Sequence, residues 1–193
     1  KLLIERGDEI RVVATHGADT LATAAEAAGV DRLILEKAHR VTAEHLPEEV
    51  DVIVAAHCHA FIAAEARARA RRAAIGYHPS LLPRHRGIAA IEWTIACRDP
   101  IAGGTIYHLS ETMDGGAIAL QDWCFVYPED DAASLWRRAL APMGLTLFRR
   151  VLAQIESIGH ADALEQDPRA VTLAPPLPAA APTAEVRRLA RPA

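Results

Sequence analysis

The stretch Tyr77-His-Pro-Ser-Leu-Leu-Pro-Arg-His-Arg-Gly87 follows a short apolar run and interrupts regular secondary structure. Pro79 and Pro83 lack a backbone N–H and hold φ at about −65°, so this stretch is predicted to be a stiff loop. His78 stands at the junction of strand and loop, where an open α/β sheet places groups that handle ligands. We therefore expect the chemistry of this protein at this loop, together with the later stretch Met113-Asp-Gly-Gly116.

Outward from this loop, apolar strands alternate with helical segments. The run Asp51-Val-Ile-Val-Ala-Ala56 has the pattern of a strand buried on both faces of a parallel sheet. Further strands are predicted at 9–14, 30–35 and 73–77, and helices at 21–28, 62–72 and 89–98. This alternation predicts an α/β fold: a doubly wound, Rossmann-like domain with a mostly parallel sheet.

The second half of the chain adds a hairpin and a long helix. Strands at 105–109 and 117–126 flank the Asp-Gly-Gly turn, which predicts a β-hairpin. Asp130 to Ser134 can cap a C-terminal helix that runs to about residue 158, with a kink or a division at Pro142. Beyond residue 159 the chain is rich in Pro and Ala, which predicts an extended segment outside the core. We expect a catalytic domain over 1–159 and a tail over 160–193.

Composition narrows the class of protein. With 193 residues, of which 51% are apolar, the chain can bury one substantial core. A net charge of −4 gives no basic field for nucleic acid, and no apolar run approaches the roughly 18 residues of a membrane span. The three cysteines (Cys58, Cys97 and Cys124) are too few and too scattered for a disulfide framework or a Cys-rich zinc site. These features are typical of a soluble cytoplasmic domain.

The string His-Pro-Ser-Leu-Leu-Pro-Arg-x-Arg-Gly at 78–87, followed by Thr105 and by Asp114-x-Gly116, resembles the folate-dependent formyltransferase family. The resemblance spans about residues 52–151, and the separation of His78 from Asp114 agrees with the family's His and Asp. The motif is most similar to the hydrolase domain of 10-formyltetrahydrofolate dehydrogenase. Family members begin with a strand ahead of the helix predicted at 1–7, so we expect a chain that lacks this strand through truncation.

The resemblance implies a formyl donor, 10-formyltetrahydrofolate, a small-molecule amine as acceptor and no metal. Formyl transfer passes through a tetrahedral intermediate with a developing oxyanion, and one proton must move from the amine to the leaving nitrogen. A His beside an Asp suits both tasks, because the carboxylate orients the imidazole and favours its charged form. His78 and Asp114 are therefore the candidate catalytic residues, rather than a loop cap and a turn former.

The resemblance also implies binding residues for folate and acceptor. The folate pocket is expected at the end of the 51–56 strand and in the loop before Asp114, with the candidate residues Cys58, His59, Ala60, Phe61, Leu82, Thr112 and Met113. For Phe61, a place in the core is an equally good interpretation. Ser80, Arg84, Arg86 and Gly87 are the candidate substrate-binding residues. The arginines would meet the glutamate tail of folate or an acceptor phosphate, or else form a solvated surface.

One departure from the family's pattern leaves alternatives open. The transferases carry an Asn two residues before the His, where this chain has Gly76, whereas the dehydrogenase's hydrolase domain carries an aliphatic residue there. Hydrolysis of 10-formyltetrahydrofolate to formate is therefore the alternative reaction, and folate binding without turnover is a third. Two further hypotheses are a metal held by His57 and His59 and a homodimer through Leu120 and Trp123.

Overall fold

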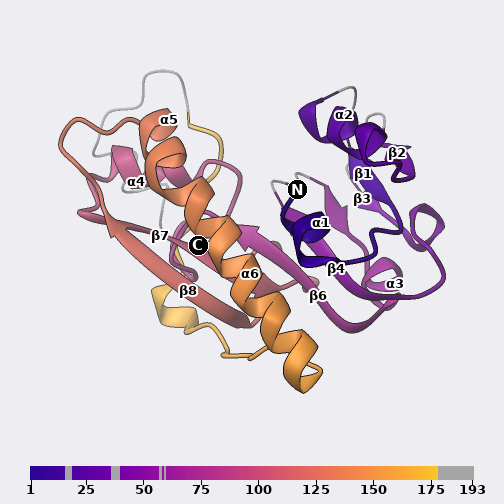
Figure 1. The fold of residues 1–193 in the computed structure, drawn as a ribbon. Coiled ribbons are helices and arrows are strands. Elements are labelled where there is room, and N and C mark those ends of the chain that lie inside the picture. Colours follow the sequence, from indigo (N-terminus) through magenta and orange to yellow (C-terminus); the bar gives the residue numbers. More distant parts are fainter. Residues whose placement is uncertain (16–18, 36–39, 57, 59, 178–193) are drawn as a thin grey trace. The chain divides into compact units, whose positions relative to one another are not determined.

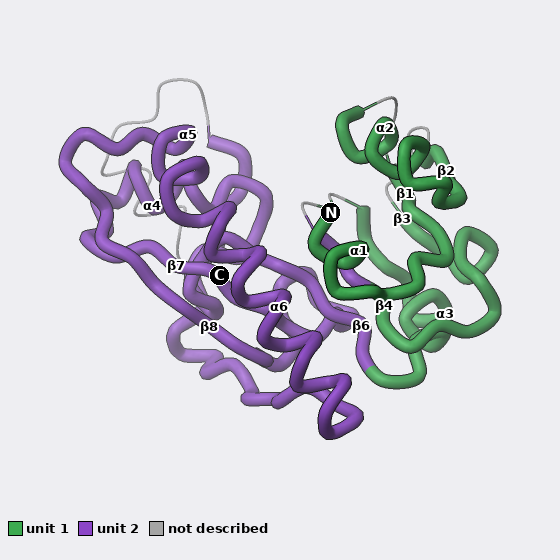
Figure 2. Tube along the Cα trace, in the orientation of Figure 1, with its two compact units in different colours: residues 1–53, 58–72 green, residues 54–57, 73–193 purple. Residues whose placement is uncertain are grey.

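The computed structural model of this chain describes residues 1–15, 19–35, 40–56, 58 and 60–177. The chain forms two compact units (Figure 2). Unit 1 comprises residues 1–53 and 58–72, and unit 2 comprises residues 54–57 and 73–193. We describe each unit by itself.

Unit 1 begins with a β-α-β arrangement (Figure 1). After α1 (Leu2–Arg6) come β1 (Val13–Thr15), α2 (Thr20–Ala27) and β2 (Arg32–Ile34), and β1 and β2 pair in parallel. The Asp19 carboxylate accepts a hydrogen bond from the backbone N–H of Ala22 at 2.8 Å and so caps α2. The helix and the two strands predicted from the sequence in this region are confirmed, although each strand is shorter than predicted.

The rest of unit 1 packs around small side chains. It contains β3 (Arg40–Val41), η1 (Ala43–His45), β5 (Phe61–Ile62) and α3 (Ala64–Arg67), and β3 and β5 pair in parallel. Its core consists of Leu35, Val41, Ala60, Ala63 and Ala66.

The prediction of a helix over 62–72 is wrong, because α3 has only four residues. Strand β6 already begins at Ala70, and the backbone N–H of Val50 donates to the Arg69 carbonyl. Arg71 also forms an ion pair with Asp51 at 2.7 Å. These pairings override the helical preference of an Ala-rich segment.

A four-stranded sheet has the order β4-β6-β7-β8 and comprises β4 (Val50–Ala56), β6 (Ala70–His78), β7 (Ile101–His108) and β8 (Ile118–Phe125). The pairs β6–β7 and β7–β8 are antiparallel. The predicted hairpin is confirmed, and with the parallel pairs of unit 1 the chain has the predicted mixed α/β, Rossmann-like fold.

Helices cover the sheet of unit 2. Besides α4 (Ala90–Ala96), a continuous helical stretch runs through α5 (Ala132–Leu135), the π-helical turn η2 (Trp136–Leu140) and α6 (Ala141–Ile158), and α6 lies along β7 and β8 (Figure 1). The hydrogen-bond pattern changes just before Pro142, as expected of a residue without an N–H. No helix of the described residues is long and apolar enough to cross a membrane.

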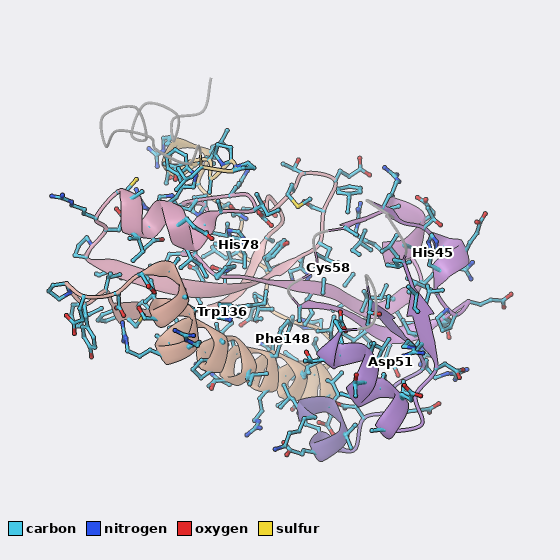
Figure 3. All side chains as sticks on the ribbon, turned by 90° about the horizontal axis from the view of Figure 1, so that it is seen from above. His45, Asp51, Cys58, His78, Trp136 and Phe148 are labelled. Carbon is cyan, nitrogen blue, oxygen red and sulfur yellow. The ribbon has the colours of Figure 1, made fainter. Side chains whose placement is uncertain are left out.

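Tyr77 anchors this helical stretch to β6. Its ring contacts those of Trp136 and Phe148, with centroids 6.5 and 6.2 Å away, and Figure 3 labels these two residues of the helical stretch. Its hydroxyl donates to the Leu140 carbonyl at 2.6 Å, and burial raises the pKa of Tyr77 well above its ordinary value. The residue before His78 is therefore fixed by packing and a hydrogen bond.

The segment 160–177 departs from the prediction of a tail outside the core. Ala161 and Ala174 are buried, and Ala174 lies in a cluster with Trp93. The backbone of Arg86 bonds to the carbonyl of Thr172 and to the N–H of Ala174, at 2.9 and 2.7 Å. Proline at the first position is compatible with the short 3-10 helix η3 (Pro168–Ala170) of this segment, and the extended backbone around Leu173 bridges to Arg86. The assignment of one functional domain to residues 1–159 stays a prediction.

Candidate active site

The buried hydroxyl of Thr105 helps to hold the loop that follows β6. Thr105 lies opposite His78 in the β6–β7 pairing and is fully buried. Its Oγ1 donates to the Ser80 carbonyl at 2.6 Å and accepts from the Leu82 N–H at 3.1 Å. The Gln121 amide donates to the same oxygen at 2.8 Å. The loop backbone is therefore tied to β7 and β8 immediately after His78.

Thr105→Val is expected to lower the free energy of unfolding by about 2–3 kcal/mol, because valine keeps the shape but leaves buried donors and acceptors without partners. Thr146→Val is the matched control, since Thr146 is an exposed residue of α6, and it should change stability by less than about 0.5 kcal/mol. Urea denaturation of both variants measures the difference. Equal effects would show that Thr105 does not anchor the loop.

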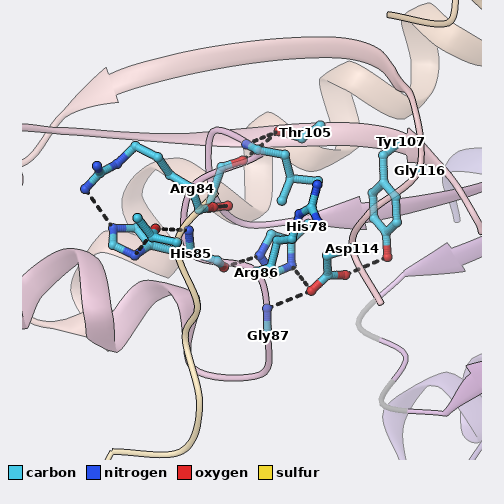
Figure 4. A network of polar contacts seen from close by, with 12 residues as sticks. His78, Arg84, His85, Arg86, Gly87, Thr105, Tyr107, Asp114 and Gly116 are labelled. Carbon is cyan, nitrogen blue, oxygen red and sulfur yellow. Dashed lines mark hydrogen bonds and ion pairs between the residues drawn. The ribbon is translucent and has the colours of Figure 1, made fainter. Parts of the chain in front are cut away.

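The two predicted catalytic residues lie together in unit 2 (Figure 4). His78 Nδ1 is 3.5 Å from Asp114 Oδ2, and both side chains are buried. His78 Nε2 is 2.7 Å from the His85 carbonyl oxygen. Because a carbonyl oxygen only accepts, Nε2 carries a proton, and Nδ1 faces the carboxylate.

Two further donors fix the Asp114 carboxylate. Its Oδ2 accepts from the backbone N–H of Gly87, and its Oδ1 accepts from the hydroxyl of Tyr107, each at 2.8 Å (Figure 4). The turn around it requires glycine, because a Cβ at Gly116 would lie 1.8 Å from the His108 carbonyl oxygen. Sequence reasoning missed Tyr107, although its place on the strand preceding Asp114 was a usable signal.

Gln166, from the segment after α6, bridges the two loops of the site. Its Oε1 accepts from Arg86 Nε and Nη2 at 3.1 and 2.7 Å, and its Nε2 donates to the carbonyls of Asp114 and Gly116 at 2.8 and 2.7 Å. Burial lowers the pKa of Arg86, whereas the charge of Asp114 acts in the opposite direction. Arg86 is thus engaged by Gln166, a residue for which the sequence carried no signal.

Of the other predicted substrate-binding residues, Ser80 and Arg84 border a cavity of about 300 Å³ in unit 2, whereas Gly87 does not. Arg84 Nη2 and His85 Nε2 contact Asp99 Oδ2 at 2.9 and 2.7 Å. Burial opposes ionisation of Asp99, but the hydrogen bonds from His85 and Arg84 leave its pKa below the ordinary value. Ser80, Arg84, His85, Thr94 and Asp99 are among the residues that line this cavity, and His78 and Asp114 are not.

The predicted folate-binding residues fall in both units. In unit 1, Cys58 is exposed, Ala60 belongs to the core, and the Phe61 ring lies 5.3 and 5.9 Å from the guanidinium carbons of Arg40 and Arg67. Phe61 is therefore a cation–π partner within its unit. His59, like His57, lies outside the described residues.

In unit 2, Leu82 is buried beside Tyr107, whereas Thr112 and Met113 are exposed in the loop before Asp114. Thr112 and Met113 are thus open to a ligand, and Leu82 is a packing residue for Tyr107. Within the described part of the chain, no group of three or more His, Cys, Asp or Glu residues is placed to hold a metal ion.

Fold and site define an α/β protein with a buried His–Asp pair at the end of a sheet strand. The family model described as formyl transferase matches residues 14–151. The cytosolic 10-formyltetrahydrofolate dehydrogenase of Mus musculus is 38% identical over 136 residues, which cover 66% of this chain and 15% of the relative. Methionyl-tRNA formyltransferase of Anaplasma phagocytophilum is 34% identical over 134 residues, covering 69% of this chain and 42% of that protein. This chain belongs to the formyl transferase family.

Solved structures agree on the fold. A sugar 3N-formyl transferase, crystallised with dTDP and 5-N-formyl-THF, superposes with a TM-score of 0.73 at 16% identity over 90% of this chain and 63% of that one. Phosphoribosylglycinamide formyltransferase from Bacillus halodurans gives 0.67 at 18% identity, over 81% and 87% of the two chains. At this identity the likeness concerns the fold alone.

Proposed function

We propose that this chain binds 10-formyltetrahydrofolate and transfers its formyl group to the amine of a small-molecule acceptor. The observation that carries the proposal is the buried His78–Asp114 pair, whose carboxylate is fixed by the Gly87 N–H and the Tyr107 hydroxyl. Membership of the formyl transferase family supports the donor. The chain spans only about a sixth of the length of the dehydrogenases it matches, so the reaction is proposed for the domain described here.

The geometry suits the two demands of the reaction. The acceptor nitrogen attacks the formyl carbon, and the C–N bond forms as the carbonyl oxygen becomes an oxyanion. The bond to N10 of the folate then breaks while a proton passes from the acceptor nitrogen to N10. His78 Nε2 already donates to the His85 carbonyl, so Nδ1 is the ring atom left for proton exchange. Asp114, next to Nδ1, stabilises the charged imidazole, accepts the proton that the amine loses and returns it through this pair to N10 as the bond to N10 breaks.

Hydrolysis is the second candidate, in which water replaces the amine and formate leaves. The specific observation that favours it is that neighbouring side chains fill the space beside Gly76, the position at which the transferases carry an Asn. A Cβ there would lie 3.1 Å from the Tyr107 ring and 3.0 Å from Leu109 Cδ2. Tyr77 and Thr105 do not substitute for a polar side chain at this position, because their hydroxyls donate to the carbonyls of Leu140 and Ser80. The similarity to the dehydrogenases supports the same alternative.

The decisive experiment follows tetrahydrofolate formation from 10-formyltetrahydrofolate, with and without a panel of amino-sugars and amino-nucleotides. We expect turnover that depends on one class of amine and yields its N-formyl product. Acceptor-independent release of formate would establish the hydrolase instead. Folate binding without turnover under either condition would overturn both candidates.

We also propose a second copy of this chain as a partner at the edge strand β8. Trp123 and Phe125 are exposed there and contact each other edge to face at 5.1 Å, whereas Leu120 is half-buried and contributes less than the sequence suggested. β8 is the last strand of the described sheet, and beyond Ile118, whose backbone pairs with Leu164, its outer edge can pair with the same edge of a second molecule. A monomer in sedimentation velocity at all concentrations would contradict this.

A further inference from the structure

Tyr107 and Gly76 face each other across the β6–β7 ladder, two positions along from the pair of His78 and Thr105. Because side chains alternate along a strand, these four residues share one face of the sheet. The Tyr107 ring covers Gly76 so closely that an added Cβ would come within 3.1 Å of both Cε1 and Cζ. Contacts this short are tighter than ordinary van der Waals contact, so a side chain at residue 76 would require the ring to move by a few tenths of an ångström.

The strand geometry holds this ring in place. The β7–β8 register shifts by one residue at this point, because Ile106 faces Leu120 whereas Tyr107 faces Ile118. Such a bulge re-aims side chains next to functional sites. Tyr107 is buried in a cluster with Leu82 and Ile118, and its hydroxyl reaches Asp114 Oδ1 at 2.8 Å. The ring is thus held by packing, and its hydroxyl points toward Asp114 Oδ1.

We infer that Tyr107 is a positioning residue for Asp114 and that Gly76 is the small partner that makes this possible. The inference rests on the proposed function, in which Asp114 acts in its ionised form beside His78. With Oδ1 held by Tyr107 and Oδ2 by Gly87, the carboxylate cannot rotate away from the imidazole. The charged and titratable groups that face it are His78, Tyr107 and Arg86.

Tyr107→Phe tests this, because it keeps the ring against Gly76 and removes only the donor to Asp114. We expect kcat to fall about tenfold with the KM for the donor within about twofold, since one hydrogen bond to a charged group is lost. Tyr127→Phe is the matched control, since Tyr127 is 48% exposed outside the site, and it should change neither quantity.

Gly76→Ala supplies the second arm of a double-mutant cycle. A methyl group there pushes the ring away from Asp114, so Gly76→Ala should lower kcat as Tyr107→Phe does. The double variant should be no slower than the worse single variant, because both remove the same hydrogen bond. Additive losses would overturn the coupling between the two residues.

A readout besides activity separates this inference from the proposed function. The ¹³C carboxyl chemical shift of Asp114 can be compared in the native protein, in Tyr107→Phe and in Tyr127→Phe. A change only in Tyr107→Phe supports the positioning role even if the native protein proves to have no turnover. Identical chemical shifts in all three proteins, or an unchanged kcat in an active Tyr107→Phe, would overturn it.

Discussion

Asp114→Asn is expected to lower turnover of 10-formyltetrahydrofolate by about 10²–10⁴-fold, the range typical of a lost acid–base group. Asparagine has nearly the same size but carries no charge, so it neither stabilises a charged His78 nor accepts a proton. Its single amide oxygen also cannot accept from Gly87 and Tyr107 in the two directions that the carboxylate satisfies. Steady-state kinetics with the formyl donor measures the loss.

Binding separates a catalytic from a merely structural role for Asp114. Equilibrium titration with folate, followed by protein fluorescence, should give an affinity within a few-fold of the native value. Asp122→Asn is the matched control, because Asp122 is an exposed carboxylate on β8, and it should keep full activity. An active Asp114→Asn variant, or one that binds no folate, would contradict the catalytic assignment.

Gln166→Leu is expected to cost about 3 kcal/mol of unfolding free energy and to reduce kcat as well. Leucine leaves the Arg86 guanidinium and the carbonyls of Asp114 and Gly116 without their partner in a partly buried place. Because those carbonyls belong to the turn that carries Asp114, the turn should lose its fixed geometry. Chemical denaturation and kinetics on the same preparation measure both effects.

The comparison for this variant is Gln154→Leu, which removes one exposed hydrogen bond to the Asp162 N–H. That variant should lose less than about 1 kcal/mol and keep its kcat. If Gln166→Leu behaved like Gln154→Leu, the hydrogen bonds of Gln166 would not stabilise the site.

Local sequence signals predicted the fold class, and the resemblance to the formyltransferase family indicated the candidate catalytic pair. The capped helix after Asp19 and the loop after His78 form as predicted. The strand at 51–56 also forms, but its residues are half-buried or exposed and not buried on both faces. The structure places the candidates His78 and Asp114 3.5 Å apart.

The helix predicted over 62–72 shows where local signals fail. Alanines favour a helix when nothing competes, but here residues from Ala70 onward join β6, and Arg71 pairs with Asp51 twenty positions earlier. Local signals also fail for the Pro-rich segment after α6, which they place outside the core. Its extended backbone forms hydrogen bonds with the backbone of Arg86.

Tertiary structure alone decided how the pair is held. Tyr107 reaches Asp114 because Gly76 lies across the ladder and the register of β8 shifts at that point. Gln166 reaches the same turn from 50 residues further along the chain. The sequence by itself determined which residues are the candidates for the chemistry. Their fixed orientation depends on strand register and on contacts distant in sequence, which no local pattern encodes.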